Sequence, residues 1–318
     1  MQQMILDVDT GIDDALALIV AVRHPEVNLR AVTCVAGNAS LDQVVRNTLT
    51  VLDASGAGDI PVAAGAHRPL VAQANHAAHV HGMDGLGDLG LPESSRSLTP
   101  MHAVELLRRE ILASPTPVTL VPLAPLTNIA LLVRMYPEVL ANVERIVFMG
   151  GSASVGNATA VAEFNTWHDP EAAEIVLGAG VPITMYGLDV FYAVTIAPDD
   201  ISRLAAASEP GMQLAGRLLK HIVSVKGGET RVAGDGHGDI GDAGAVCAAI
   251  DPTRLSTVNL PVSVSLGDPL TRGQTVVDHR TAGHEQPGSS DALFRRIDVA
   301  LDIDGVHYAQ LFLDTITR

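Results

Sequence analysis

Short runs of β-branched and apolar residues alternate with longer amphipathic runs over the first 190 residues of the chain. The short runs have the length of buried strands, and the longer runs repeat their apolar residues with a helical period. The predicted strands are residues 5–8, 29–35, 118–121, 145–149 and 183–186, and the predicted helices are residues 14–23, 41–54, 102–113, 126–135 and 170–177. This alternation is typical of an α/β fold with crossover connections. We predict an open, mostly parallel, doubly wound sheet.

The pattern changes after Pro198. Two helices and three strands are predicted there, at residues 210–225 and 243–250, and at 258–266, 274–278 and 295–303. The sequence leaves open whether these strands extend the sheet or form a hairpin at its edge. Because no linker or shift in composition separates this part, we predict a single domain over residues 1–318. Two glycine-rich stretches, 72–96 and 226–244, have the length of lid or binding loops.

Charge and composition exclude several classes of protein. The chain has 20 basic and 36 acidic residues and a net charge of −16, which disfavours a nucleic-acid partner. Its longest apolar runs, such as residues 15–22, are far shorter than a membrane span, and no secretory leader precedes the first strand. Cys34 and Cys247 lie in apolar stretches and are expected to be buried thiols of a reducing compartment. We expect a cytoplasmic protein without a membrane partner.

Four acidic residues lie within eight positions at the end of the first predicted strand: Asp7, Asp9, Asp13 and Asp14. That edge of an open α/β sheet is where ligands bind. A helix N-terminus explains one or two of these acids, but four carboxylates on one turn repel each other unless a cation compensates. Oxygen ligands alone favour Ca²⁺ or Mg²⁺ over zinc. Gly11 is expected to permit a tight turn between the two pairs.

Further motifs follow this cluster along residues 4–250. They are Val35-Ala-Gly-Asn38, Pro125-Leu-Thr-Asn128, Met149-Gly-Gly151, Gly156-Asn157, Ala162-Glu-Phe-Asn165, Asp169-Pro-Glu-Ala-Ala173, Gly187-Leu-Asp-Val190 and Asp242. In these motifs and their order the chain resembles the inosine-uridine preferring nucleoside hydrolases. The resemblance implies hydrolysis of the N-ribosidic bond of nucleosides in salvage, and a homodimer or homotetramer.

The resemblance also implies a metal ion and a base. A Ca²⁺ ion would be held by the side chains of Asp9, Asp14 and Asp242 and by the main-chain carbonyl of Thr127. Such a ligand set suits Ca²⁺, which takes six to eight oxygens and leaves room for a water and two ribose hydroxyls. Asp13 would take a proton from the attacking water, as in inverting glycoside hydrolysis.

The same resemblance assigns the ribose contacts. Asn157, Glu163 and Asn165 would hold the sugar hydroxyls, and Asn38 would lie near the water and the sugar. Asn38 and Asn165 also suit ordinary turn positions, a role that does not account for Glu163. Asp189 is either structural or close to the sugar.

The chain departs from the family pattern where the base leaves. Nonspecific members carry a histidine directly before the last metal-binding Asp, as the acid that protonates the base, and this chain has Gly241 there. His81 stands in the place of a pocket histidine of pyrimidine-preferring relatives, and its imidazole suits proton delivery near pH 7. An ordinary loop position is the alternative for His81. His237, on the second glycine-rich stretch, is a further candidate.

Base preference is predicted from aromatic residues. The purine-specific branch stacks the base between tryptophans, whereas this chain has one, Trp167, which is expected to pack at a helix start. Stacking could come from Phe191, Tyr192 or His81, and the roles of Arg231 and Tyr192 in the base pocket stay open. Because uracil leaves as a delocalised anion, we expect a preference for uridine or another pyrimidine nucleoside.

Two other functions remain possible from the residues. The Asp7-x-Asp9 pair fits a phosphatase with an aspartate nucleophile, although Gly11 stands where such enzymes carry a hydroxyl residue. A non-catalytic nucleoside-binding or Ca²⁺-binding relative would explain Gly241, but it has no need of Asp13.

Overall fold

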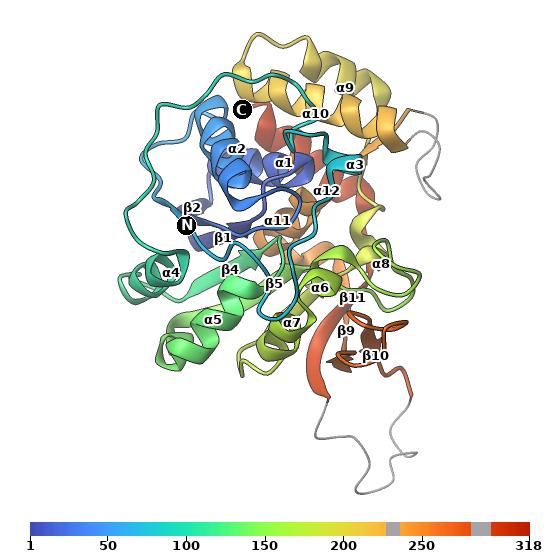
Figure 1. Cartoon of the computed structure of the whole chain (residues 1–318). Coiled ribbons are helices and arrows are strands. Elements are labelled where there is room, and N and C mark those ends of the chain that lie inside the picture. The colour runs from blue at the N-terminus through green and yellow to red at the C-terminus, as the bar shows by residue number, and fades with distance from the viewer. Residues whose placement is uncertain (227–235, 281–293) are drawn as a thin grey trace, which may run out of the picture.

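Nine strands form the central sheet of the computed structural model, which describes residues 1–226, 236–280 and 294–318 (Figure 1). Their order across the sheet is β10-β9-β11-β6-β5-β4-β1-β2-β3. The strands are β1 (Gln2–Val8), β2 (Val27–Cys34), β3 (Val62–Ala64), β4 (Val118–Pro122), β5 (Val143–Met149), β6 (Ile183–Tyr186), β9 (Leu255–Val264), β10 (Thr275–Val277) and β11 (Arg295–Ile303).

All strands from β3 to β11 in this order pair in parallel, and β9 pairs antiparallel with both β11 and β10. The open, mostly parallel sheet is therefore confirmed. The late strands extend the sheet at β6, which answers the question that the sequence left open. β3 was not predicted, because three residues are too few to show a period.

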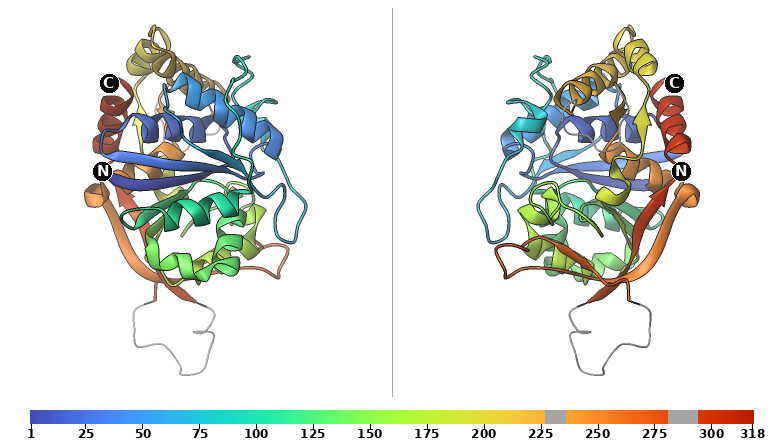
Figure 2. Two further views of the ribbon diagram at one scale, coloured as in Figure 1. Left: turned by 90° about the vertical axis from the view of Figure 1, so that its left-hand side faces the viewer. Right: turned by 90° about the vertical axis from the view of Figure 1, so that its right-hand side faces the viewer.

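Helices cover both faces of the sheet, and each face has its own apolar core (Figure 2). One face carries α1 (Ile12–Arg23), α2 (Leu41–Ala54), α9 (Pro198–Ala205), α10 (Pro210–Lys226), α11 (Asp242–Ile250) and α12 (Gly305–Ile316). The other carries α4 (Ala103–Leu112), α5 (Thr127–Met135) and α7 (Pro170–Leu177). The doubly wound arrangement follows from these two layers.

Several short elements complete the described chain. They are the helices α3 (Ala78–His81), α6 (Phe164–His168) and α8 (Leu188–Phe191), the 3₁₀ turns η1 (Pro137–Asn142) and η2 (Pro252–Arg254), and the antiparallel pair β7 (Thr195–Ile196) and β8 (Gly238–Asp239). The first glycine-rich stretch contains α3. Residues 227–235 of the second, including Arg231, lie outside the described residues.

Helix α1 is buried on nearly all sides, because α2, α10, α11 and α12 pack around it. Its sequence is apolar at almost every position after the two acids, as expected of a helix without a solvent face. The N-terminus of α1 therefore carries Asp13 and Asp14 into the interior of the protein.

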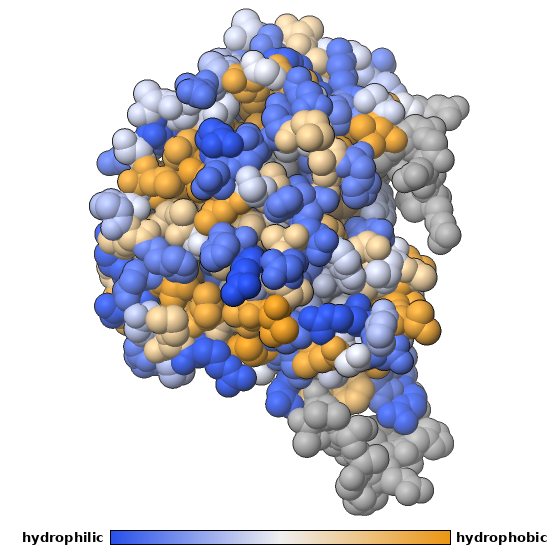
Figure 3. All heavy atoms as spheres, viewed as in Figure 1, coloured by the Kyte–Doolittle hydropathy of each residue, from blue (hydrophilic) through white to orange (hydrophobic). Residues whose placement is uncertain are grey.

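The remaining expectations concern thiols and surface. Cys34 and Cys247 are both buried and free, as predicted. Among the described residues, no helix has the length and apolar character that crossing a bilayer requires. Figure 3 shows the apolar residues of one face as small groups among polar ones. Exposed apolar side chains of this kind are ordinary on protein surfaces.

Candidate active site

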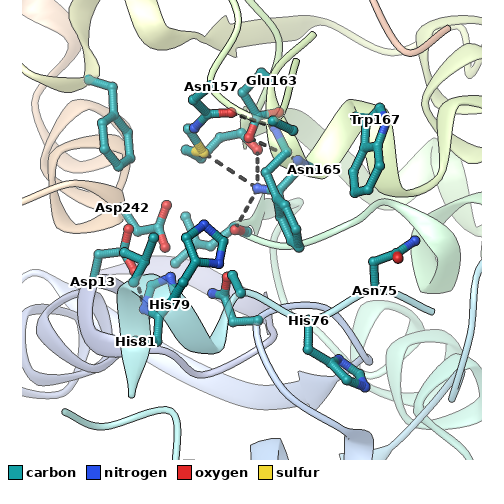
Figure 4. Close-up of a pocket in the computed structure, with 18 of the residues that line it drawn as sticks. Asp13, Asn75, His76, His79, His81, Asn157, Glu163, Asn165, Trp167 and Asp242 are labelled. Carbon is teal, nitrogen blue, oxygen red and sulfur yellow. Dashed lines mark hydrogen bonds and ion pairs between the residues drawn. The ribbon is translucent and has the colours of Figure 1, made fainter. Parts of the chain in front are cut away.

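A pocket of about 410 Å³ opens at the carboxyl ends of the parallel strands. Seven of the predicted site residues line it: Asp13, Asn38, His81, Asn157, Glu163, Asn165 and Asp242. Figure 4 shows Asp13, His81 and Asp242 on one side of the pocket, and Asn157, Glu163 and Asn165 on the other. Segments from the whole chain meet here because parallel strands end at one edge of the sheet.

Three carboxylates form a group beneath the pocket. One oxygen from each of Asp13, Asp14 and Asp242 lies within 4.8 Å of the other two. Asp13 and Asp14 belong to the first turn of α1, and Asp242 is the first residue of α11. Within the described parts of the chain, Oδ1 of Asp13 is buried and accepts no hydrogen bond. A buried carboxylate oxygen without a donor is costly, unless a cation or a proton faces it.

Asp9 lies beside this group and is held by Asn38. Its two carboxylate oxygens accept hydrogen bonds from the main-chain amide of Asn38 at 2.7 Å and from the Asn38 side chain at 3.1 Å. Asp14 accepts from the main-chain amides of Asp9 and Gly11 at 3.2 and 2.9 Å. The group of three carboxylates does not include Asp9, although Asp9 and Asp14 are in contact.

Burial and mutual repulsion raise the pKa of Asp9, Asp14 and Asp242. Burial is the larger cause for Asp9 and Asp242, whose pKa lies well above the usual range, and neighbouring carboxylates add to it. The pKa of Asp14 rises to about 7, from burial and from the charge of Asp13. Oxygen-only donors, an unsatisfied carboxylate and this cost of charging together fit a hard divalent cation.

Asp7 lies apart from the pocket. Its Oδ1 accepts hydrogen bonds from Thr33 at 2.6 Å and from the side chain of Asn128 at 2.8 Å, and burial raises its pKa to about 7. Asn128 also donates to the carbonyl of Cys34 and accepts from the amide of Ala66. Asp7 thus ties β1 to β2 and α5. A phosphatase with Asp7 as its nucleophile is disfavoured, because Asp7 does not line the pocket.

Gly11 serves close packing rather than a turn. Its φ is −94°, a conformation open to any residue, so the expectation of a glycine-only turn is wrong. A Cβ at this position would lie 2.6 Å from Nδ1 of His81 and 2.8 Å from Nδ2 of Asn38. The glycine lets both side chains reach the acid cluster.

His81 is buried against the start of α1. Its Nδ1 accepts a hydrogen bond from the amide of Ile12 at 3.1 Å and lies 3.9 Å from Oδ1 of Asp13. Because Nδ1 is the acceptor, the proton of the neutral ring sits on Nε2. The structure therefore brings His81 next to Asp13.

The opposite wall is built on the N-terminus of α6. Glu163 caps this helix and accepts hydrogen bonds from the amides of Asn165 at 2.8 Å and Gly151 at 2.9 Å. Burial raises its pKa to about 7. Asn165 donates to the carbonyls of Leu123 and Met149. Asn165 is thus a helical residue fixed to two strand ends rather than the turn residue that its type allows.

Comparison with known proteins assigns this arrangement to a family. The family model described as inosine-uridine preferring nucleoside hydrolase matches residues 4–308. The chain belongs to this family. The pyrimidine-specific ribonucleoside hydrolase RihA of Shewanella sp. (strain MR-7) is 40% identical over 314 residues, which are 98% of this chain and 95% of that protein. The inosine-uridine preferring nucleoside hydrolase of Leishmania major is 38% identical over 319 residues, with 100% and 98% covered.

Solved structures agree with this assignment. A structure titled plant nucleoside hydrolase PpNRh1 superposes with a TM-score of 0.91 at 28% identity, and the match covers 99% of each chain. The protein is an enzyme that hydrolyses the N-ribosyl bond of ribonucleosides. The family is metal-dependent, and the three carboxylates are a possible site for the ion.

In this nucleoside hydrolase the peptide around Thr127 is fixed by Asp169, to which the sequence analysis gave no role although it opens one of the family motifs. The hydroxyl of Thr127 donates to Oδ2 of Asp169 at 2.6 Å, and the same oxygen accepts from the amide of Leu70 at 2.9 Å. The other oxygen of Asp169 caps α7 through Ala172. The motif and the proline at position 170 were the signals in the sequence, and neither indicates the link to Thr127.

Asp189 is structural. It accepts hydrogen bonds from the amide of Ala153 at 2.7 Å and from the hydroxyl of Ser154 at 2.6 Å. These contacts hold the loop that follows β5 and carries Asn157 to the pocket. Asn157 in turn accepts from the amide of Phe164 at 2.9 Å.

The remaining residues are those that the sequence analysis considered for the base. Trp167 packs against Phe164 just before the start of α7 and also lines the pocket. Phe191 and Tyr192 line it as well, with their rings edge to face at 4.9 Å. His237 is not among the lining residues that the structure describes. Arg231 lies outside those residues.

Gly241 has a backbone that a side chain cannot adopt without strain. Its φ is +50° and its ψ is −121°, in a turn closed by the bond from the Ala243 amide to the Ile240 carbonyl. A Cβ here would lie 2.7 Å from Cβ of Asp13 and 2.9 Å from Cζ of Phe191. The packing of Asp13 and Phe191 against Gly241 therefore leaves no room for the histidine that nonspecific family members carry at this position.

Proposed function

We propose that this nucleoside hydrolase depends on Ca²⁺, prefers pyrimidine ribonucleosides such as uridine and serves nucleoside salvage. The group of three carboxylates beneath a pocket of nucleoside size carries the proposal. Its oxygen-only donors favour Ca²⁺ over softer metals.

The ligands of Ca²⁺ would be Asp9, Asp14, Asp242 and the carbonyl of Thr127. When bound, the ion supplies a positive charge that lowers the pKa of water and attracts ribose hydroxyls. The charge of the ion also offsets the repulsion that raises the pKa of Asp14 and Asp242.

Asp13 is the proposed general base. Its Oδ1 has no hydrogen-bond partner among the described residues and Asp13 lines the pocket, which supports a role in accepting a proton from water. As the water oxygen bonds to C1′ of ribose and the C1′–N bond breaks, Asp13 takes the proton of the water. Asn38, Asn157, Glu163 and Asn165 hold the sugar, and the carboxylates favour the positive charge that develops on the ribose.

His81 is the proposed acid for a neutral base. Its Nε2 carries the proton of the neutral ring, because Nδ1 accepts from Ile12. A departing pyrimidine spreads its negative charge over the ring and needs less help from an acid than a localised anion would. The name of the pyrimidine-specific relative supports the same preference.

Assembly and location are part of the proposal. We expect a homodimer or homotetramer, which light scattering coupled to gel filtration would measure. Two buried free thiols suit the reducing cytoplasm.

The test is ribose release from uridine, cytidine, inosine and adenosine, with enzyme depleted of metal and then reloaded with Ca²⁺, Mg²⁺ or Zn²⁺. We expect kcat/KM for uridine to exceed that for inosine, and Ca²⁺ to restore activity best. A purine preference or restoration by Zn²⁺ alone would refute the respective part of the proposal. The variant Asp13→Ala serves as the control for enzyme-catalysed release.

A further inference from the structure

We propose that Asn47, a buried residue of α2, is a positioning residue for the reaction, which sets His81 against the start of α1. The inference rests on the proposed role of His81 as the acid and adds a residue from outside the pocket. Asn47 is 4% exposed and is not among the residues that line the active-site pocket. Any effect of Asn47 on the reaction is therefore transmitted through the segments that it holds.

The side-chain amide of Asn47 bridges the two segments that carry the proposed acid and the proposed base. Its Nδ2 donates hydrogen bonds to the carbonyl of Thr10 at 3.0 Å and to the carbonyl of Asp84 at 2.8 Å. Thr10 precedes the first turn of α1, which carries Asp13, and Asp84 follows α3, which ends at His81. Because both hydrogens of the amide are used in this way, the side chain fixes one segment relative to the other.

The loop after α3 is compact enough to transmit this hold to His81. The amide of Gly87 donates to the carbonyl of His81 at 2.7 Å, which closes the loop on itself. Inside the loop, the carboxylate of Asp84 accepts from the amides of Leu86 at 2.7 Å and Asp88 at 2.9 Å. A displacement of Asp84 is therefore expected to move the backbone of His81 with it.

Gly85 brings this loop against Asn47. A Cβ at Gly85 would lie 2.8 Å from Nδ2 of Asn47 and 3.6 Å from the carbonyl oxygen of Thr10, and the φ of Gly85 is +78°. A larger residue here would push the loop away from α2. The loop, the amide of Asn47 and the segment before α1 are thus packed as one unit.

The segment before α1 has a second support on α2. The hydroxyl groups of Thr10 and Thr48 lie 2.6 Å apart and share a hydrogen bond. This bond remains when the amide of Asn47 is removed, so the carboxylates that follow Thr10 should keep their places. The effect of such a change should therefore fall on His81 rather than on the acid cluster.

His81 tolerates little displacement. Its Nδ1 lies 3.1 Å from the amide nitrogen of Ile12 and 3.9 Å from Oδ1 of Asp13. When the amide on α2 is lost, the loop keeps a contact of 3.3 Å between Nε2 of His221 and the carbonyl of Val80, which ties it to α10 rather than to α1. A misplacement of about 1 Å can lower a rate by about 10²-fold, so a small shift of the imidazole is measurable.

The experiment is a double-mutant cycle on the Ca²⁺-loaded enzyme with uridine as substrate. Asn47→Leu keeps the approximate size of the side chain and removes both donors without adding a charge. We expect it to lower kcat/KM about tenfold or more when His81 is present, and less than about twofold in the His81→Ala background. Gln43→Ala is the matched control, because Gln43 donates to Oδ1 of Asn47 at 2.8 Å and its loss leaves both carbonyl contacts in place.

A second readout separates an effect on the acid from a loss of packing. The anion of 5-fluorouracil is more stable than that of uracil, because fluorine withdraws electrons, so its departure depends less on an acid. The losses of kcat/KM in Asn47→Leu and in His81→Ala should both be smaller for 5-fluorouridine than for uridine, by about threefold or more. A merely structural role would lower kcat/KM equally for the two substrates.

Each outcome decides the inference. Equal factors in the two backgrounds, equal losses for the two substrates, or full activity of Asn47→Leu would overturn it and leave His81 as the acid. Full activity of His81→Ala would refute the proposed acid and overturn the inference with it. If Asn47→Leu does not fold, Asn47→Ala carries the same test, since its smaller side chain leaves room for water at the two carbonyls.

Discussion

Gly241 and Asp13 meet where the N-termini of α11 and α1 converge, and a Cβ on Gly241 would lie 2.7 Å from Cβ of Asp13. The contact links the residue that most departs from the family pattern to the proposed general base. A histidine cannot be restored at position 241 without moving one of the two helices or Asp13 itself.

We therefore expect Gly241→Ala to lose both stability and activity. The positive φ and the collision with Asp13 should together cost about 2 kcal/mol or more, and displacement of Asp13 should lower kcat. Gly56→Ala is the matched control, since Gly56 has φ +73° but open space around a Cβ. Urea unfolding and ribose release measure the two effects, and equal losses in both variants would contradict the packing argument.

The variant Asp13→Asn should lose activity but not stability. Oδ1 of Asp13 accepts no hydrogen bond from the described residues, and removing its charge relieves repulsion on Asp14 and Asp242. We expect kcat to fall by about 10³-fold or more, with a melting temperature unchanged or higher. A folded variant that retains more than a tenth of the activity would exclude Asp13 as the base. Glu93→Gln, at an exposed position, controls for loss of an acid.

Calcium should stabilise the protein more at high pH than at low pH. The pKa of Asp14 is raised to about 7 in the metal-free protein. Protonated Asp14 therefore contributes stability at low pH, and this contribution is lost as the pH rises through about 7. Ca²⁺ binds the ionised form and restores the loss, so its effect grows over the same range.

Melting curves with Ca²⁺ and with chelator at pH 5.5 and pH 8 measure this difference. Titration calorimetry in two buffers of different ionisation enthalpy should also report proton release on binding near pH 6. An increase in melting temperature that is the same at both pH values would contradict the assignment of the carboxylates as ligands.

The variant Asp189→Ala should raise KM more than it lowers kcat. Asp189 holds the loop at Ala153 and Ser154, and this loop presents Asn157 to the pocket. Loss of this order should weaken sugar binding by about tenfold while Asp13 stays in place. Asp199→Ala on the exposed start of α9 is the control. A fall in kcat with KM unchanged would instead place Asp189 at the reacting atoms.

The sequence predicted the parallel sheet and the acid cluster because both are local patterns. A buried strand and the amphipathic helix after it each have a recognisable pattern of apolar residues. Four acids within eight residues form a local cluster that needs no knowledge of distant contacts. It did not predict the short strand β3 or the links from Asn128 to Asp7 and from Asp169 to Thr127. These hydrogen bonds join positions 121 and 42 residues apart, and residue types alone do not tell which distant partner a buried amide or carboxylate will find.

Gly11 and Trp167 show a second limit of the sequence. A glycine between two acid pairs indicates a turn, but its role is to leave room for His81 and Asn38, which come from other segments. A tryptophan at a helix start indicates packing, but α6 itself forms a wall of the pocket. In both cases the residue type was interpreted from its neighbours in sequence, and the contacts are tertiary.

Because α1 is enclosed by other helices, the site consists of a buried part on α1 and a more exposed part at the pocket wall, and the residues of the two parts can be substituted independently. Asp13 and Asp14, two of the acids proposed to carry the chemistry, sit on a helix enclosed by α2, α10, α11 and α12, and segments buried in this way are among the last parts of a protein to open. The residues proposed to surround the base come instead from α3, α6 and α8 and from the loops between them. Substitutions there can exchange one heterocycle for another while the cleavage of the ribosyl bond is preserved, which makes the choice of nucleobase the more readily altered property of this fold.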